Sequence, residues 1–318
     1  MISNLYEVIR KGSTMESKRG FMDRKNGLIA ELGDLEYRTD VLARSYTSFR
    51  IGGPMAFFAE PRSVDELCKF LCAAGRCGYP VYVIGNGSNL LVSDDGVDAL
   101  FIRICEKMSS CSFHGTSVTA DAGALLCSVA KASVCRGLRG LEWAAGIPGT
   151  VGGGVAMNAG AYDGEIKQVL KSVRIIKNGM IVEKRVSDGD LGYRYSSFAY
   201  PDSIVVSATM ELNNDDGCAK ALMDEYGQRR RQKQPLEYPS AGSTFKRPKG
   251  YFAGKLIEDA GLKGARVGNA MVSVKHAGFI INCGGATFND VMGLIELVRT
   301  TVMRKFKVNL EPEVKIIR

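Results

Sequence analysis

The sequence predicts an α+β fold of two or three packed parts, and three observations indicate this. Residues 49–84 give a strand, a helix and a second strand in succession. Asn178-Gly179, between two apolar runs, is typical of a tight hairpin turn, and strand-like segments continue to about Leu212. Near the end of the chain a helix precedes a terminal strand. A length of 318 residues suits more than one domain of ordinary size.

The first strand-helix-strand unit has clear boundaries. An apolar run ends at Pro61, and Ser63 and Glu66 have the spacing of a helix-capping box. Apolar residues then recur every three or four positions, which predicts a helix that Gly78 ends before a strand at 81–84.

A second helix is expected from Ala124 to about Arg136, with Gly137 as its C-terminal cap. Residues 143–162 carry no charge, but six glycines and Pro148 make them a poor helix. We therefore expect a buried loop system there rather than a membrane span.

The C-terminal part begins after a polar turn cluster, residues 213–217, which is the best candidate for a domain boundary. An arginine-rich helix follows it. Thr287 and Asp290 again have capping-box spacing, ahead of a helix to about Phe306 and a strand at 314–317. The expected organisation is an N-terminal extension with helical turns (1–47), a first domain (48–214) and a second domain (215–318).

Composition bears on nucleic-acid binding, metal binding and cellular location. The formal charge is +8, but no basic tail or aromatic-interleaved basic stripe is present, so phosphorylated small molecules explain the charge as well as a nucleic acid does. Two histidines and nine cysteines without a C-x-x-C pair argue against a metal site, and the cysteines are interpreted as small core residues. The N-terminal residues lack a secretory signal, which predicts a cytoplasmic protein.

Two glycine-rich segments are the first candidates for a binding site. Gly85-Asn86-Gly87-Ser88-Asn89 follows a strand, and its small residues allow backbone N–H groups to approach a pyrophosphate. It lacks the third glycine of the dinucleotide fingerprint, so an ordinary turn is the alternative. Residues 146–154 contain five glycines, which suggests that a flat or bulky group passes close to the backbone, and Asn158-Ala159-Gly160-Ala161-Tyr162 follows. The alternative there is a tight structural crossover.

Two such loops about sixty residues apart resemble the FAD-binding domain of the vanillyl-alcohol oxidase (PCMH) type. The motifs themselves resemble the UDP-N-acetylenolpyruvoylglucosamine reductase family. Four further motifs occur in the family's order and extend the resemblance over about residues 48–317: Tyr193-Arg194-Tyr195-Ser196, Gly242-Ser243-Thr244-Phe245-Lys246, Lys275-His276-Ala277-Gly278 and Leu310-Glu311-Pro312-Glu313.

The resemblance implies an FAD-binding domain in two lobes, an α/β substrate-binding domain at the C-terminus, and non-covalent FAD. It also implies NADPH-dependent reduction of UDP-enolpyruvyl-N-acetylglucosamine in peptidoglycan precursor synthesis. No nucleic-acid, membrane or obligate protein partner is expected. The flavin contacts that it implies are Gly85, Asn86, Gly87, Ser88, Asn89, Gly146, Ile147, Gly149, Thr150, Val151, Gly152, Asn158 and Ala159.

Three residues match the catalytic positions of the family: Arg194, Ser243 and Glu313. A guanidinium suits the negative charge that develops beside the substrate carboxylate after hydride addition. A hydroxyl suits proton donation to the adjacent carbon. An ionised glutamate would be repelled by that charge unless protonated or paired, so orientation or proton relay is expected. Without the motifs, the three would be interpreted as a surface ion pair, a turn serine and an exposed strand glutamate.

The implied substrate contacts are Tyr162, Arg229, Lys233, Arg247 and His276. Lys233 and Arg229 lie one helical turn apart and supply cations for a diphosphate. His276 is interpreted either as a substrate contact or as a partly buried polar residue. The interval from Tyr200 to Arg229 is too short for the substrate-capping loop of one branch of the family, so the chain resembles the branch without it. The alternatives are another flavin oxidase of this fold and a nonenzymatic protein that binds a sugar nucleotide or a nucleic acid.

Overall fold

The computed structural model describes residues 18–318, which form two compact units. The first comprises residues 18–40, 55–86 and 98–226, and the second comprises residues 41–54, 87–97 and 227–318. Each unit is therefore built from chain segments that are distant in sequence. Helix α6 (Ala219–Lys233) begins in the first unit and ends in the second.

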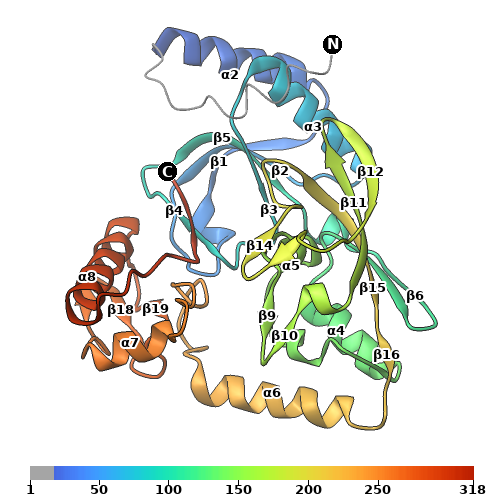
Figure 1. Cartoon of the computed structure of the whole chain (residues 1–318). Coiled ribbons are helices and arrows are strands. Elements are labelled where there is room, and N and C mark those ends of the chain that lie inside the picture. The colour runs from blue at the N-terminus through green and yellow to red at the C-terminus, as the bar shows by residue number, and fades with distance from the viewer. Residues whose placement is uncertain (1–17) are drawn as a thin grey trace. The chain divides into compact units, whose positions relative to one another are not determined.

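One sheet of the first unit has four strands in the order β1-β2-β5-β3. Strands β3 and β5 are parallel, and α2 lies beside α3 (Figure 1). Phe57, Leu67 and Phe70 are fully buried, because β2 and the inner face of α3 turn their apolar side chains inward. The elements are α2 (Lys18–Leu32), β1 (Tyr37–Leu42), β2 (Pro54–Ala59), α3 (Val64–Cys77), β3 (Val81–Ile84) and β5 (Val97–Arg103).

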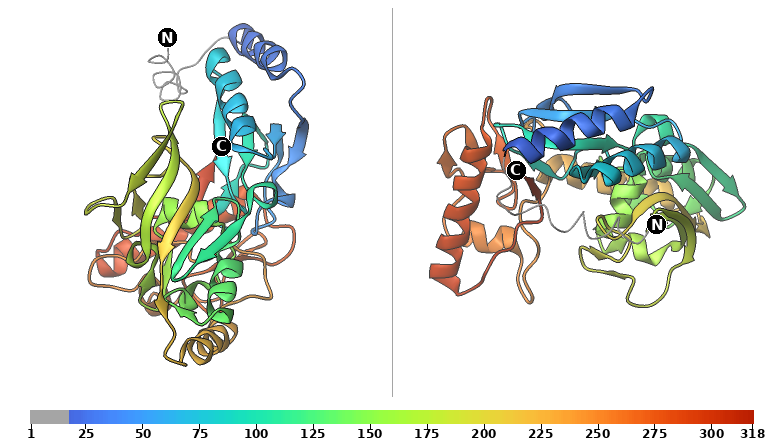
Figure 2. Two further views of the ribbon diagram at one scale, coloured as in Figure 1. Left: turned by 90° about the vertical axis from the view of Figure 1, so that its right-hand side faces the viewer. Right: turned by 90° about the horizontal axis from the view of Figure 1, so that it is seen from above.

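A second sheet of this unit has five antiparallel strands in the order β12-β11-β15-β7-β6 (Figure 2). Its β11–β12 hairpin turns at Asn178 and Gly179, whose φ angles of 52° and 73° fit the predicted tight turn. The strands are β6 (Cys111–His114), β7 (Ser117–Asp121), β11 (Leu170–Lys177), β12 (Met180–Arg185) and β15 (Ile204–Glu211).

Short elements complete the first unit, and one of them corrects an expectation. Residues 143–162 are not only loops, because Val151–Met157 form helix α5. Thr150 caps that helix, and this hydrogen bond offsets part of the cost of three consecutive glycines. The other short elements are η2 (Glu106–Met108), α4 (Leu126–Cys135), β8 (Leu138–Arg139), η3 (Glu142–Ala144), β9 (Gly160–Ala161), β10 (Gly164–Glu165), η4 (Ile166–Gln168), β13 (Leu191–Gly192), β14 (Tyr195–Ser196) and β16 (Asn213–Asn214).

The second unit has its own core beneath α8, where Val291, Leu294 and Val298 are fully buried. Helices α7 and α8 pack together, and α8 covers a three-stranded sheet in the order β17-β18-β19 (Figure 1). Strand β20 pairs in parallel with β4. The elements are η1 (Ala43–Ser45), β4 (Leu90–Val92), α7 (Ala253–Asp259), β17 (Arg266–Val267), β18 (Ala270–Val272), β19 (Ile280–Asn282), α8 (Phe288–Phe306) and β20 (Lys315–Ile317).

Two predicted helix starts have different outcomes. Thr287 and Asp290 form the complete capping box at the start of α8. At α3 only half of the box forms: the Ser63 hydroxyl accepts from the Glu66 N–H, whereas the Glu66 carboxylate accepts from the N–H of Arg62. Both helices nevertheless begin where the sequence predicts.

Two expectations need correction. The N-terminal segment is more than an extension with helical turns, since α2 buries Leu28 and Leu32 in the core and β1 joins a sheet; residues 1–17 lie outside the described chain. The cysteines are not uniformly core residues, because Cys111, Cys135 and Cys218 are exposed and only Cys105 is buried. None of the helices formed by residues 18–318 combines the length and apolar character of a membrane span.

Candidate active site

The first glycine-rich loop follows β3 and requires its glycines. A Cβ on Gly85 would collide with the Thr150 side chain, and one on Gly87 would collide with the carbonyl of Tyr46. Gly87 also has a φ of 64°, in the left-handed region that glycine adopts at little cost. The Asn86 Nδ2 donates to the Pro148 carbonyl at 2.7 Å, which ties this loop to the second glycine-rich loop.

The second loop leads into the first turn of α5. The Thr150 hydroxyl accepts from the Gly153 N–H at 3.2 Å, and the Gly152 N–H donates to Ala122. The two loops present backbone, amide and hydroxyl groups and no carboxylate, a donor set that fits a dinucleotide diphosphate. The predicted flavin contacts in this loop are Gly146, Ile147, Gly149, Thr150, Val151 and Gly152.

Asn158 follows α5 and is completely buried. Its Nδ2 donates to Glu165 and to the Gly192 carbonyl, both at 2.9 Å, and its Oδ1 accepts from the Lys167 N–H at 3.0 Å. The side chain is therefore used within the protein.

Arg194 lies in the two-residue turn between β13 and β14, with a φ of 53°. Its guanidinium donates to the carbonyls of Asn158 and Gly160 at 3.4 and 3.3 Å. Because Asn158 also holds Gly192, the same residue supports both the strand before Arg194 and the guanidinium itself. The arginine is thus half-buried and directed toward the segment after α5.

Asp190 anchors the base of this turn. It is buried, and its carboxylate accepts from Lys184 at 2.6 Å and from the hydroxyls of Ser187 and Ser197, both at 2.8 Å. Burial by itself raises the pKa of this carboxyl, but the bonds to Lys184 and the two serines outweigh it and hold the pKa well below its usual range.

The second unit brings Ser243 and Glu313 onto adjacent backbone segments. Between them the Glu313 N–H donates to the Thr244 carbonyl at 2.8 Å, and Phe245 pairs with Pro312. The Asn89 Nδ2 donates to the Glu313 carbonyl at 3.2 Å. Ser243 has an exposed side chain beside the buried Thr244, so the chain fixes its backbone and leaves its hydroxyl accessible.

His276 lies on a third segment, which is joined to the segment of Ser243 and Thr244. The Thr244 N–H donates to the Gly278 carbonyl at 2.9 Å, and the His276 Nδ1 accepts from the Gly278 N–H at 3.0 Å, which leaves the proton of the neutral imidazole on Nε2. Burial lowers the pKa of His276, and the charges of Lys263 and Lys233 lower it further. His276 is thus both a partly buried polar residue and a neighbour of the predicted substrate-binding lysine.

The remaining predicted substrate contacts have varied surroundings. Lys233 and Arg229 are exposed on α6. The Arg247 guanidinium lies 3.8 Å from the centroid of the Phe252 ring. Tyr162 stacks on Tyr226 with ring centroids 4.4 Å apart, so one face of its ring is covered within the first unit.

Comparison with known proteins shows which family the chain is similar to. Residues 234–317 match the model for the C-terminal domain of UDP-N-acetylenolpyruvoylglucosamine reductase, and residues 55–183 match an FAD-binding domain. The reductase from Clostridium novyi is 46% identical over 89% of this chain and 92% of its own length. That from Clostridium botulinum (strain Hall) is 45% identical over 93% of this chain and 98% of its own.

The chain belongs to the UDP-N-acetylenolpyruvoylglucosamine reductase family. Its fold also resembles the crystal structure of the reductase from Thermus caldophilus, with a TM-score of 0.77 and 34% identity over 89% of this chain and 99% of that one. The predicted fold class is confirmed, and FAD is the cofactor.

Sequence reasoning missed Asp190 as a support of the Arg194 turn. The signal was available, because Ser187 and Asp190 have the spacing of a capping box, in which the carboxylate accepts from the N–H three residues earlier. It also missed the stacking of Tyr226 on Tyr162, since no local pattern relates residues 64 positions apart.

Proposed function

We propose that this reductase family member uses NADPH and FAD to reduce UDP-enolpyruvyl-N-acetylglucosamine to UDP-N-acetylmuramate, with Arg194, Ser243 and Glu313 as its catalytic residues. The observation that supports the proposal most directly is the pairing of the Ser243 and Glu313 segments by backbone hydrogen bonds. Bound FAD would supply the hydride for C3 of the enolpyruvyl group.

Ser243 donates the proton that C2 requires. Its hydroxyl is a weak acid, but the charge that develops at C2 is strongly basic, so transfer is feasible where the geometry is fixed. The exposed hydroxyl on a backbone held by the Thr244 bonds suits this role.

Arg194 stabilises the charge that spreads from C2 into the substrate carboxylate, since a guanidinium stays ionised and offers paired donors. Two carbonyl contacts support its orientation. Glu313 orients the substrate or relays a proton. Its backbone is fixed by Thr244 on one side and by Asn89 on the other.

The substrate's diphosphate binds cations of the C-terminal part, Lys233 and Arg229, with Tyr162, Arg247 and His276 as further contacts. The pKa of His276 is lowered, first by burial and then by the positive charges of Lys263 and Lys233. The effect of Lys233 supports the assignment of both residues to one binding site. A neutral imidazole donates from Nε2 to a phosphate or hydroxyl oxygen.

For the organisation of the chain, we propose an N-terminal segment (1–47), an FAD-binding domain (48–214) and a substrate-binding domain (215–318). The two family matches, residues 55–183 and 234–317, fall inside the last two ranges. A cytoplasmic location follows from the proposed substrates, a sugar nucleotide and NADPH.

The test separates the two half-reactions under anaerobic conditions. NADPH should bleach the absorbance of the bound flavin, and addition of UDP-enolpyruvyl-N-acetylglucosamine should restore it. UDP-N-acetylglucosamine, which lacks the enolpyruvyl group, is the matched control and should leave the flavin reduced. Reoxidation by both compounds, or by neither, would refute the proposed substrate.

A further inference from the structure

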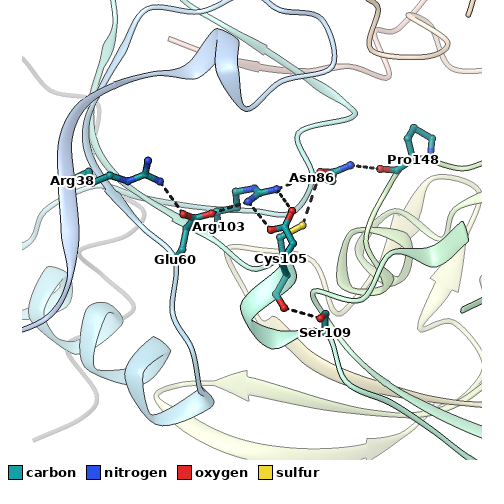
Figure 3. Close-up of polar contacts among 8 residues, drawn as sticks. Arg38, Glu60, Asn86, Arg103, Cys105, Ser109 and Pro148 are labelled. Carbon is teal, nitrogen blue, oxygen red and sulfur yellow. Dashed lines mark hydrogen bonds and ion pairs between the residues drawn. The ribbon is translucent and has the colours of Figure 1, made fainter. Parts of the chain in front are cut away.

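Arg103, at the end of β5, lies in a network of charged side chains beside the first glycine-rich loop (Figure 3). Its side chain is only 11% exposed. Nη1 contacts Glu60 at 2.7 Å and Glu106 at 2.8 Å, and Nη2 donates to the second oxygen of Glu106 at 3.0 Å. Two carboxylates therefore hold the guanidinium plane in one orientation.

Both carboxylates have further support. Arg38 contacts the other oxygen of Glu60 at 2.8 Å. The bond to Arg103 is the largest cause that lowers the pKa of Glu106, so this carboxylate remains ionised near neutral pH. Arg103, at 11% exposed, and Glu60, at 21%, form the buried part of this network, which fixes the position of the guanidinium.

The network reaches the glycine-rich loop through Asn86. The Asn86 Oδ1 faces Arg103 Nη2 at 3.5 Å and the Cys105 Sγ at 3.9 Å (Figure 3). A flipped amide would place its NH₂ group against the guanidinium, which is unfavourable because both are donors. The guanidinium thus favours the same amide orientation that the Pro148 carbonyl requires, in which Nδ2 donates to that carbonyl at 2.7 Å.

We propose that Arg103 is a positioning residue for FAD binding, which acts by fixing the Asn86 amide as a bridge between the two glycine-rich loops. The bridge joins residues 85–86 to residues 148–150, where a Cβ on Gly85 would already meet Thr150, so the loops are held at a single separation. The inference rests on FAD as the cofactor and not on the identity of the reduced substrate.

The experiment measures how fast FAD leaves the holoenzyme, from the flavin fluorescence that appears after dilution. Arg103→Lys keeps the charge but loses the planar fork, and Asn86→Ala removes the bridge. Each should release FAD about tenfold faster, roughly the effect of one hydrogen bond. In the Asn86→Ala background, Arg103→Lys should add less than about twofold, because the residue acts through the missing amide.

The matched control is Arg62→Lys, which alters an exposed ion pair with Glu36 in the same unit and should leave FAD release unchanged. If Arg103→Lys fails to fold, Glu106→Gln replaces it in the double-mutant cycle with Asn86→Ala, because it alters a more exposed partner of Arg103. It should accelerate release in the wild-type background and not in Asn86→Ala.

Additive effects of Arg103→Lys and Asn86→Ala in the double variant would overturn the proposal. Unchanged FAD release in Arg103→Lys together with a lowered urea midpoint would also overturn it, because that is the result for a purely structural arginine. Failure of the proposed function is distinguishable from failure of this proposal. A wild-type protein that binds FAD but does not reduce the enolpyruvyl sugar still allows FAD release to be measured in every variant.

Discussion

The turn that carries Arg194 and the segment that carries Ser243 are fixed in different ways. The Arg194 turn depends on side chains: the Asp190 carboxylate at its base, and the Asn158 amide on Gly192. The Ser243 segment depends chiefly on backbone, through bonds of Thr244 to the segments at Gly278 and Glu313, with one further bond from the Ile280 N–H to the Thr244 hydroxyl. A backbone-held residue tolerates changes in its neighbours, whereas a turn held by side chains is sensitive to them. Substitutions that test each region should therefore have different effects.

The largest effect is expected at Ser243, where substitution changes chemistry and not support. In Ser243→Ala, flavin reduction by NADPH should keep the wild-type rate, while reoxidation by the enolpyruvyl sugar should slow by about 10² to 10⁴. Ser243→Cys should recover part of the loss because it retains an acidic proton. Stopped-flow absorbance measures both steps, and equal slowing of the two would exclude the proton-donor role.

Asn158 tests the region held by side chains. Asn158→Ala should lower the free energy of unfolding by about 2–3 kcal/mol, because the completely buried Asn158 amide makes three hydrogen bonds, to Glu165, the Gly192 carbonyl and the Lys167 N–H, and all three are lost. Thr244→Ser in the other region keeps the hydroxyl that accepts from Ile280 and should change stability by much less. Urea denaturation measures both. A similar loss in both variants would remove the distinction between the two regions.

Asp190 tests the support of the Arg194 turn through the pH dependence of stability. Its folded-state pKa is lowered, so its contribution to stability is present above the unfolded-state pKa of about 3.9 and is lost as pH falls toward the folded-state value. Asp190→Asn should therefore be less stable than wild type between pH 5 and 8, and the difference should shrink below about pH 4. Urea midpoints measured across this range test the sign, and a difference that grows on acidification would contradict it.

Lys233 should have the smallest effect on the fold. Lys233→Ala should raise the Michaelis constant for the sugar nucleotide or NADPH about tenfold, roughly the effect of one charge-assisted contact, with thermal stability nearly unchanged. Lys220→Ala, on an exposed ion pair of the same helix, is the matched control and should alter neither. A marked loss of stability in Lys233→Ala with normal Michaelis constants would identify a structural lysine.

The sequence by itself determined the local structure and the family. The α8 capping box and the Asn178-Gly179 turn involve residues within three positions of each other, so their geometry follows from local backbone chemistry. The order of the motifs around Ser243 and Glu313 was sufficient for the family. Helix α5 was missed because glycine disfavours helix, and only its Thr150 cap and burial in the core offset that preference.

Only the tertiary structure decided how the site residues are supported. The contacts from Asn158 to Gly192, from Asn86 to Pro148 and from Thr244 to Glu313 join residues 34 to 69 positions apart, and no periodicity or spacing in the chain relates such pairs. The same holds for the discontinuous composition of each compact unit. Folding also shifts two pKa values, because it brings Lys184 and two serines to the Asp190 carboxylate against the opposing effect of burial, and because it buries His276.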